Sequence, residues 1–300
     1  MMNGILCIHK PEGFTSFDVV AKLRGITHQK KIGHAGTLDP MATGVLPVFL
    51  GTATRACDLL PDSDKTYIAG FQLGVVTDTQ DRTGTVLETR ESSLTWEDLL
   101  SVMERFTGDQ MQVPPMYSAV KIGGKKLYEI ARKGGEIERP ARPVTIYRLE
   151  LKEFDRAAQR GSFLASCSKG TYIRTLCHDI GQALGPGAVL TSLCRTRAAG
   201  FDLSDCLTLQ QVQDLADNGE LEQEVTPVSR VFQSLPVLRL NQPQARMFVN
   251  GVKLDLNRLS LNGAGRHSVY GPNGEFLGLA SPRPEQGELA IDKLFYQREG

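Results

Sequence analysis

The chain has 300 residues, of which 41% are hydrophobic, and 34 Lys and Arg balance 34 Asp and Glu. This length and apolar content allow one large domain, or one large and one small domain, with a sizeable core. The zero formal net charge excludes a uniformly basic or acidic protein, so the distribution of charge is the more informative feature. We expect no membrane span, because no apolar run approaches ~18 residues, and no signal peptide around the short apolar segment GILCI.

The N-terminal half mixes strands and helices. The patterns predict a strand over residues 3–10, a helix over 15–26 capped by Thr15 or Ser16, strands over 65–76 and 84–90, and a helix over 95–107. An Asp/Thr/Gly loop, TDTQDRTG, occupies residues 77–84 between the two strands. Proline-stiffened residues follow from 111 and lead to a short helix near 127–132.

The C-terminal half continues this mixture. We expect strands over residues 142–154 and 161–168, and helices over 171–184 and 208–218. After about residue 235, a strand, a short helix, an Asn-Gly hairpin over 268–281 and a strand over 288–295 predict a compact β-rich unit. Strands and helices without a regular βαβ rhythm favour an α+β fold, with domains at 1–235 and 236–300.

Charges and cysteines are unevenly placed along the chain. Residues 121–152 hold nine Lys and Arg against four acids, whereas residues 201–230 hold seven acids against one Arg. This segregation is typical of a protein with one basic face, although solvated helix faces also carry charges in runs. The six cysteines form no CxxC pair and no zinc-like cluster with histidine, so we expect free thiols, a cytoplasmic location and no metal site.

The segment GHAGTLDPMATGVLP, residues 33–47, places His34 and Asp39 among turn-forming residues. It lacks the Gly-Lys-Ser/Thr ending of a phosphate loop, and two isolated ligands make a poor metal site. The simplest structural interpretation is that Asp39 caps a helix that begins at Pro40. A carboxylate in that position can also be catalytic, because the helix would favour its ionised form.

Four further residues are open to a structural or a functional interpretation. Arg174 stands beside the apolar stripe of its predicted helix, and a buried guanidinium needs a partner, most simply a carboxylate. Tyr67 is most simply a strand aromatic that packs on a neighbour. Lys169 and Tyr172 are interpretable as surface residues around a turn.

The order of these motifs resembles the TruB family of bacterial tRNA pseudouridine synthases. The similarity covers residues 4 to about 200, through GILCIHKPEGFTSFDVV, GHAGTLDPMATGVLPVFLGTATR, DKTYIAGFQLGVVTDTQDRTG, PPMYSAVKIGGKKLYEIARKG and CSKGTYIRTLCHDIGQALG. The resemblance implies a pseudouridine synthase fold, with a mixed, mainly antiparallel central sheet flanked by helices. The tail resembles the small PUA-like RNA-binding domain of the family, through weaker motifs.

The resemblance also implies an activity and its residues. The enzyme would convert uridine to pseudouridine at position 55 of the tRNA T loop, with an everted base, no cofactor and no obligatory protein partner, as a monomer. Asp39 would be the essential carboxylate, and Arg174 would pair with it and keep it ionised. Tyr67 would be a further catalytic residue that stacks on the uracil and helps to remove its C5 proton. His34, Tyr172 and Leu193 would contact the target region, and Lys10, Lys169 and the basic segment near Lys125, Lys126 and Arg132 would meet RNA phosphates.

Three alternatives remain beside this interpretation. A non-catalytic RNA-binding protein would not need Asp39. A synthase guided by separate RNA and proteins would carry a larger tail and a different layout between residues 77 and 134. A hydrolase with Asp39 as nucleophile would need a second catalytic acid, for which the sequence offers no specific candidate.

Overall fold

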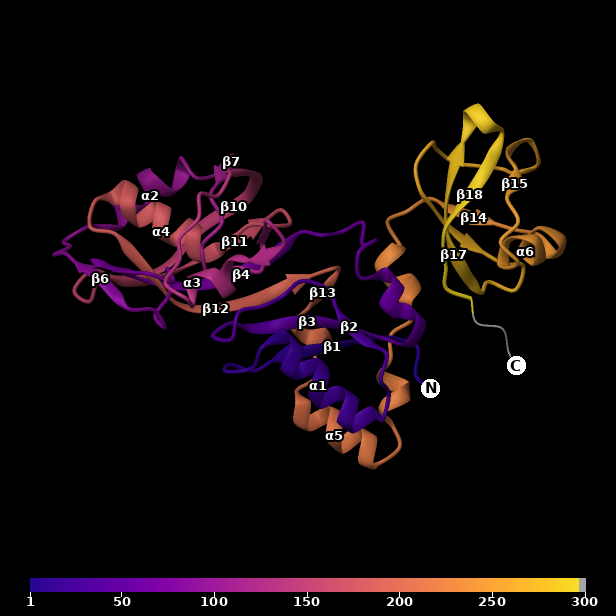
Figure 1. Cartoon of the computed structure of the whole chain (residues 1–300), viewed down its shortest axis with the longest axis horizontal. Helices are drawn as coiled ribbons and strands as arrows, with labels where there is room; N and C mark the ends of the chain where they lie inside the picture. Colours follow the sequence, from indigo (N-terminus) through magenta and orange to yellow (C-terminus); the bar gives the residue numbers. More distant parts are fainter. Residues whose placement is uncertain (297–300) are drawn as a thin grey trace.

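The structure is a computed structural model that describes residues 1–296, and its chain forms an elongated body followed by a smaller β-rich domain (Figure 1). The strands of the body are β1 (Gly4–Lys10), β2 (Ile32–His34), β3 (Thr43–Leu50), β4 (Lys65–Leu73), β5 (Val75–Thr77), β6 (Val86–Thr89), β7 (Gly108–Gln112), β8 (Lys121–Ile122), β9 (Lys125–Lys126), β10 (Arg142–Asp155), β11 (Arg160–Cys167), β12 (Ala188–Ala198) and β13 (Phe201–Asp202). The helices of the body are α1 (Ser16–Thr27), α2 (Trp96–Glu104), α3 (Leu127–Ala131), α4 (Ile173–Leu184) and α5 (Leu209–Asp217).

One mixed sheet organises the body. Its strands follow the order β1-β3-β12-β4-β11-β10-β7, with β2 added to β3 and β13 to β12. Every pairing is antiparallel except that between β12 and β3. Helices α1 and α5 pack together beside β1, and α2 and α4 cover the other end of the sheet (Figure 1). The predicted α+β fold with a mainly antiparallel sheet is confirmed.

Local signals fixed the ends of several helices. Thr15, one of the two predicted caps, caps α1, and Thr95 caps α2, each in a reciprocal capping box with the Asp three residues later. The prediction of a helix that begins at Pro40 is wrong. Residues 40–42 form a turn in which the Ala42 N–H donates to the Asp39 carbonyl at 3.0 Å, and the chain then enters β3.

A close approach of two backbones lies directly after this turn. Gly44 on β3 adopts φ +100°, and a Cβ there would stand 2.2 Å from the Arg195 carbonyl oxygen on β12. Only glycine tolerates both the backbone angle and the distance. Gly44 therefore permits the parallel contact of β3 with β12 beneath the turn that carries Asp39.

The C-terminal domain has its own sheet, in the order β14-β16-β17-β18-β15. Its elements are β14 (Val237–Arg239), α6 (Gln242–Val249), β15 (Leu254–Asp255), β16 (His267–Tyr270), β17 (Phe276–Arg283) and β18 (Glu288–Leu294). The Asn-Gly hairpin is present between β16 and β17. Phe232, which precedes the domain, stacks on Phe276 and contacts Phe295, so aromatic rings join the two units.

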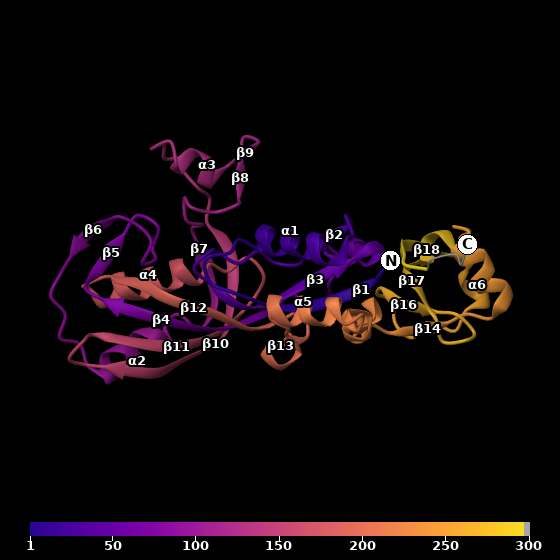
Figure 2. The ribbon, with the colours of Figure 1, turned by 90° about the horizontal axis from the view of Figure 1, so that it is seen from below.

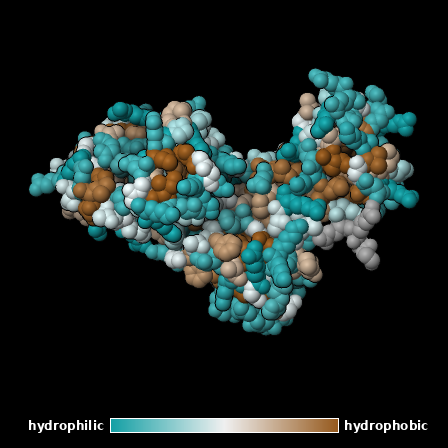
Figure 3. All heavy atoms as spheres, viewed as in Figure 1, coloured by the Kyte–Doolittle hydropathy of each residue, from teal (hydrophilic) through white to brown (hydrophobic). Residues whose placement is uncertain are grey.

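The outline of the molecule is concave. Between the body and the C-terminal domain, the surface is hollowed along one edge (Figure 3). Within residues 1–296, no helix is long and apolar enough to span a membrane.

Candidate active site

The loop between β2 and β3, residues 35–42, carries Asp39, the candidate catalytic carboxylate, and for that reason is called the catalytic loop below. Leu38 and Met41 are buried in the same apolar cluster as Tyr67, with 3% and 6% of their surfaces exposed. The Leu38 N–H donates to the Ser16 hydroxyl at 2.9 Å, which ties the loop to α1. The Asp39 side chain, between these anchors, is 37% exposed. The loop thus holds one carboxylate at the surface on a fixed backbone.

Lys10 supports this loop from below. It is fully buried, and its ammonium donates to the carbonyls of Pro11 and Phe14 on its own segment and of Pro40 in the loop, the last at 3.3 Å. Burial lowers the pKa of Lys10 to about 8, although the charge of Asp39 opposes the change. This placement contradicts the expected contact of Lys10 with RNA phosphates, because the ammonium is enclosed by protein carbonyls.

Arg174, in the first turn of α4, lies between two carboxylates. Its side chain is 4% exposed, with Nε 2.9 Å from Asp39 Oδ2 and Nη1 3.3 Å from Asp81 Oδ2. Nη1 also donates to the Thr79 carbonyl at 3.1 Å, and Nη2 donates to the Tyr117 carbonyl at 2.8 Å. The carboxylate partner that a buried arginine requires is therefore Asp39 on one side and Asp81 on the other.

Asp81 belongs to the loop of residues 77–84, which is called the Asp81 loop below. Its side chain is 5% exposed, and its Oδ1 accepts hydrogen bonds from the Thr79 hydroxyl and from both the N–H and the hydroxyl of Thr83. The carboxylate is thus fully used within the protein. Asp81 was not predicted as a site residue. The available signal was the Asp/Thr composition of this loop in a chain whose Arg174 needs a carboxylate.

The electrostatics of Asp39 differ from the expectation. Burial raises the pKa of this carboxyl, Arg174 opposes that rise, and the charge of Asp81 adds to it. The net direction is upward, whereas the ion pair alone would lower the pKa. The desolvation of Asp39 is partial, because about a third of its side chain remains open to water. Arg174 opposes the rise in pKa only in part, because its one guanidinium is shared by two carboxylates.

Tyr67, Leu193 and Tyr172 lie around the catalytic loop. Tyr67 on β4 is 6% exposed, and Leu193 on β12 is 7% exposed in the same apolar cluster as Leu38. Tyr172 precedes α4, and its backbone N–H and carbonyl both hydrogen-bond to the Gln112 side chain. The charge of Asp39 contributes to a raised pKa at both tyrosines, after the larger effect of burial.

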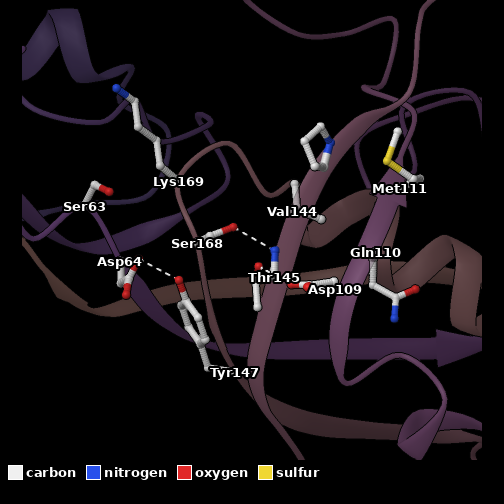
Figure 4. Close-up of a pocket in the computed structure, with 11 residues that line it drawn as sticks. Ser63, Asp64, Asp109, Gln110, Met111, Val144, Thr145, Tyr147, Ser168 and Lys169 are labelled. Atoms are coloured by element: carbon white, nitrogen blue, oxygen red, sulfur yellow. Dashed lines mark hydrogen bonds between the residues drawn. The ribbon is translucent and has the colours of Figure 1, made fainter.

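Within residues 1–296, His34 and Lys169 make neither a hydrogen bond nor an ion pair with Asp39. His34 ends β2, and burial together with the charge of Arg195 lowers the pKa of its imidazole. Lys169 is exposed and lines a cavity of about 580 Å³ with Asp64, Asp109 and Tyr147 (Figure 4). The Tyr147 hydroxyl donates to Asp64 at 3.3 Å across this cavity.

No group of three or more His, Cys, Asp or Glu residues in the described part of the chain could hold a metal ion.

A basic arm projects from the body and contains β8, β9 and α3 (Figure 2). Lys126 and Arg132 lie on the Tyr128 ring, each 5.4 Å from its centroid. The exposed residues Lys125 and Arg132 leave positive charge on the arm's surface. The Tyr117 carbonyl, which accepts from Arg174, lies in the segment that leads to the arm, so this segment is linked to the site by a hydrogen bond.

Known proteins match this chain over nearly its full length. The model of the TruB family pseudouridylate synthase N-terminal domain matches residues 24–173, and that of the tRNA pseudouridylate synthase B C-terminal domain matches residues 174–233. A tRNA pseudouridine synthase B of Bacillus pumilus is 40% identical, with 96% of each chain covered. That of Lachnoclostridium phytofermentans is 49% identical, with 84% of each chain covered.

A solved structure supports the same assignment. The crystal structure of a Cbf5-Nop10-Gar1 complex contains a chain that is 26% identical with a TM-score of 0.78, and the alignment covers 99% of this chain and 86% of that one. The family models and the full-length relatives agree with the fold, so this chain belongs to the TruB family of pseudouridylate synthases.

Proposed function

We propose that this chain converts uridine to pseudouridine at position 55 in the T loop of tRNA, with Asp39 as its catalytic carboxylate. The observation that carries this proposal is the surface carboxylate of Asp39, which rests on the buried Arg174 with Asp81 behind it. Family membership supports uridine isomerisation, and the names of the relatives specify tRNA. The reaction detaches uracil at N1 and rejoins it to C1′ through C5.

The surrounding residues take defined roles in this proposal. Tyr67 and Leu193 would form the walls for an everted uracil, because both lie in the apolar cluster that anchors the catalytic loop. Tyr67 would also exchange a proton with the base. Tyr172 and His34 would contact neighbouring parts of the RNA, and Lys169 would meet a phosphate.

Binding would extend over the concave edge of the molecule. The basic arm would contact the phosphates of the T stem-loop, and the domain at 236–300 would act as a PUA-like RNA-binding unit. We expect the chain to act as a monomer in the cytoplasm, without a protein partner or a cofactor. The solved Cbf5 structure is named as a complex with the proteins Nop10 and Gar1, whereas the relatives at 40% and 49% identity are named tRNA pseudouridine synthase B, without a partner protein in the name.

Tritium release tests the proposal directly. A tRNA transcript labelled at C5 of its uridines should release about one equivalent per molecule, and sequencing should place the product in the T loop. The Asp39→Asn variant should release none yet bind the transcript. Tight binding without release by the natural chain would instead identify an RNA-binding protein.

A further inference from the structure

Arg195 on β12 is a fully buried cation with no carboxylate partner among residues 1–296. Its Nε donates to the Val45 carbonyl at 2.8 Å, and its Nη2 donates to the Gly36 carbonyl at 3.0 Å. Its Nη1 has no hydrogen-bond partner within the described chain. A buried guanidinium without an anion is costly, so packing alone does not explain its presence.

Its two hydrogen bonds reach both sides of the catalytic loop. Gly36 comes three residues before Asp39, and Val45 lies in β3, just after the loop. Gly36 has φ +76°, and a Cβ there would stand 3.2 Å from Nη1 of Arg195. The guanidinium therefore fills the space directly beneath the loop and fixes the path of its backbone.

The same guanidinium stands beside Tyr67. Arg195 and Tyr67 are directly paired across β12 and β4, so their side chains leave the same face of the sheet. Burial raises the pKa of Tyr67 to about 12, and the charge and hydrogen-bonding capacity of Arg195 are the principal opposing influences. Burial lowers the pKa of His34, and the charge of Arg195 lowers it further.

We propose that Arg195 is a positioning residue that fixes the catalytic loop and stabilises Tyr67 as an oxyanion during proton transfer. This role rests on the proposed function. Isomerisation moves one hydrogen of uracil from C5 to N1. The Tyr67 hydroxyl gives its proton to N1 of the detached uracil. After the C5–C1′ bond forms, the phenolate takes the proton from C5 as the C–H electron pair restores the C5=C6 bond. The protein ends in its starting protonation state, and the guanidinium stabilises the phenolate between the two transfers.

The test uses the full chain containing 3,5-difluorotyrosine, whose ¹⁹F resonance reports the ionisation of each phenol. Its two ring fluorines lower the phenol pKa, so that Tyr67 ionises at a pH the fold survives. The Tyr67 resonance is identified by its loss in Tyr67→Phe. In Arg195→Gln, the ionisation midpoint of Tyr67 should rise by about 1–3 pH units, because an opposite charge within a few ångströms has been removed. Arg195→Lys should keep the midpoint within about half a unit. It should also turn over faster than Arg195→Gln, although more slowly than the natural chain, because a single ammonium cannot reproduce both carbonyl contacts.

Arg197→Gln is the matched control. Arg197 is two residues away on β12, but its side chain is 62% exposed and lies 3.6 Å from Asp62. Its removal should leave the Tyr67 midpoint unchanged. A folded Arg195→Gln variant with an unchanged midpoint would overturn the proposal. If that variant does not fold, the Lys variant decides, and a midpoint raised by a unit or more would count against the proposal.

The titration requires no turnover, so its failure is separable from a failure of the proposed function. A natural chain that makes no pseudouridine would refute the proposed function, and with it the proton transfer. If the natural chain isomerises uridine normally but the Tyr67 midpoint is the same in Arg195→Gln, only the role of Arg195 would be refuted.

Discussion

The catalytic loop and the Asp81 loop each place one carboxylate against the guanidinium of Arg174, but the two carboxylates differ in their exposure to solvent and in their other hydrogen bonds. Asp81 is 5% exposed, and its second oxygen accepts three hydrogen bonds from Thr79 and Thr83. Asp39 is 37% exposed and forms an ion pair with Arg174. One carboxylate is enclosed and satisfied, whereas the other is held in place and left open.

This difference separates stability from function at one site. An enclosed carboxylate with all its acceptors used stabilises the fold, because its removal leaves buried donors without partners. An open carboxylate whose pKa is raised adds little to stability, but it can meet a substrate. The two loops together explain how a charged group can be both rigidly aimed and chemically available.

The largest expected effect is the loss of activity in Asp39→Asn. Turnover should fall by about four orders of magnitude or more, as for the removal of other essential catalytic groups. The free energy of unfolding at pH 7 should stay the same or rise slightly, because the change removes one of two negative charges that share Arg174. Single-turnover kinetics and urea denaturation would measure both. A strongly destabilised variant would show that the open carboxylate is structural after all.

Arg174→Ala should remove the support of both loops at once. The buried Asp81 would then lack its cation, so the free energy of unfolding should fall by about 3–5 kcal/mol. A loss of this size is expected because the Arg174 side chain is only 4% exposed and contacts both loops. Arg82→Ala is the control from the Asp81 loop, because Arg82 and its partner Glu12 are about half exposed. The control should lose less than about 1 kcal/mol in urea denaturation.

Asp81→Asn should have an intermediate effect on both properties. The amide keeps the size of the side chain but loses the charge, so about 1–3 kcal/mol of stability should be lost as donors from Thr83 and Arg174 are left poorly matched. Turnover should also fall, because Arg174 would be less firmly held beside Asp39. Parallel measurement of unfolding and single-turnover rates would check this. If Asp81→Asn were as stable as Asp39→Asn, the two carboxylates would not differ in their contribution to stability.

The features that depend on residues close together in the sequence, or on a simple charge argument, were predictable. The need of Arg174 for a carboxylate and the capping boxes at Thr15 and Thr95 depend on neighbouring residues or on simple charge arguments. The central strands β3 and β12 were not assigned. Seven of the eight residues of β3 are buried, so the alternation that marks a half-exposed strand is missing.

The catalytic loop shows why local signals failed elsewhere. Asp39 followed by Pro40 suits a helix cap and a turn equally well. The choice is made by distant groups, since Ser16 holds Leu38 and Lys10 holds the Pro40 carbonyl. The burial of Lys10 was likewise invisible, because a lysine in the sequence is normally a surface charge.

The smallest expected effect is a shift in the pH dependence of activity and stability. It distinguishes Asp39 from Asp81 by titration. In the proposed function Asp39 must be ionised to act, and burial and the charge of Asp81 raise its pKa. The acid limb of kcat/KM should therefore lie above ~3.9, the ordinary value for Asp. The stability of the natural chain relative to Asp39→Asn should be greatest below ~3.9 and should decline as the pH rises through the elevated pKa, because the folded state favours the protonated carboxyl. Denaturation of both proteins between about pH 3.5 and 7, alongside the kinetic profile, would measure the two effects. A natural chain that instead gained stability over the variant as the pH rose would mean that Arg174 outweighs burial, and Asp39 would then resemble Asp81.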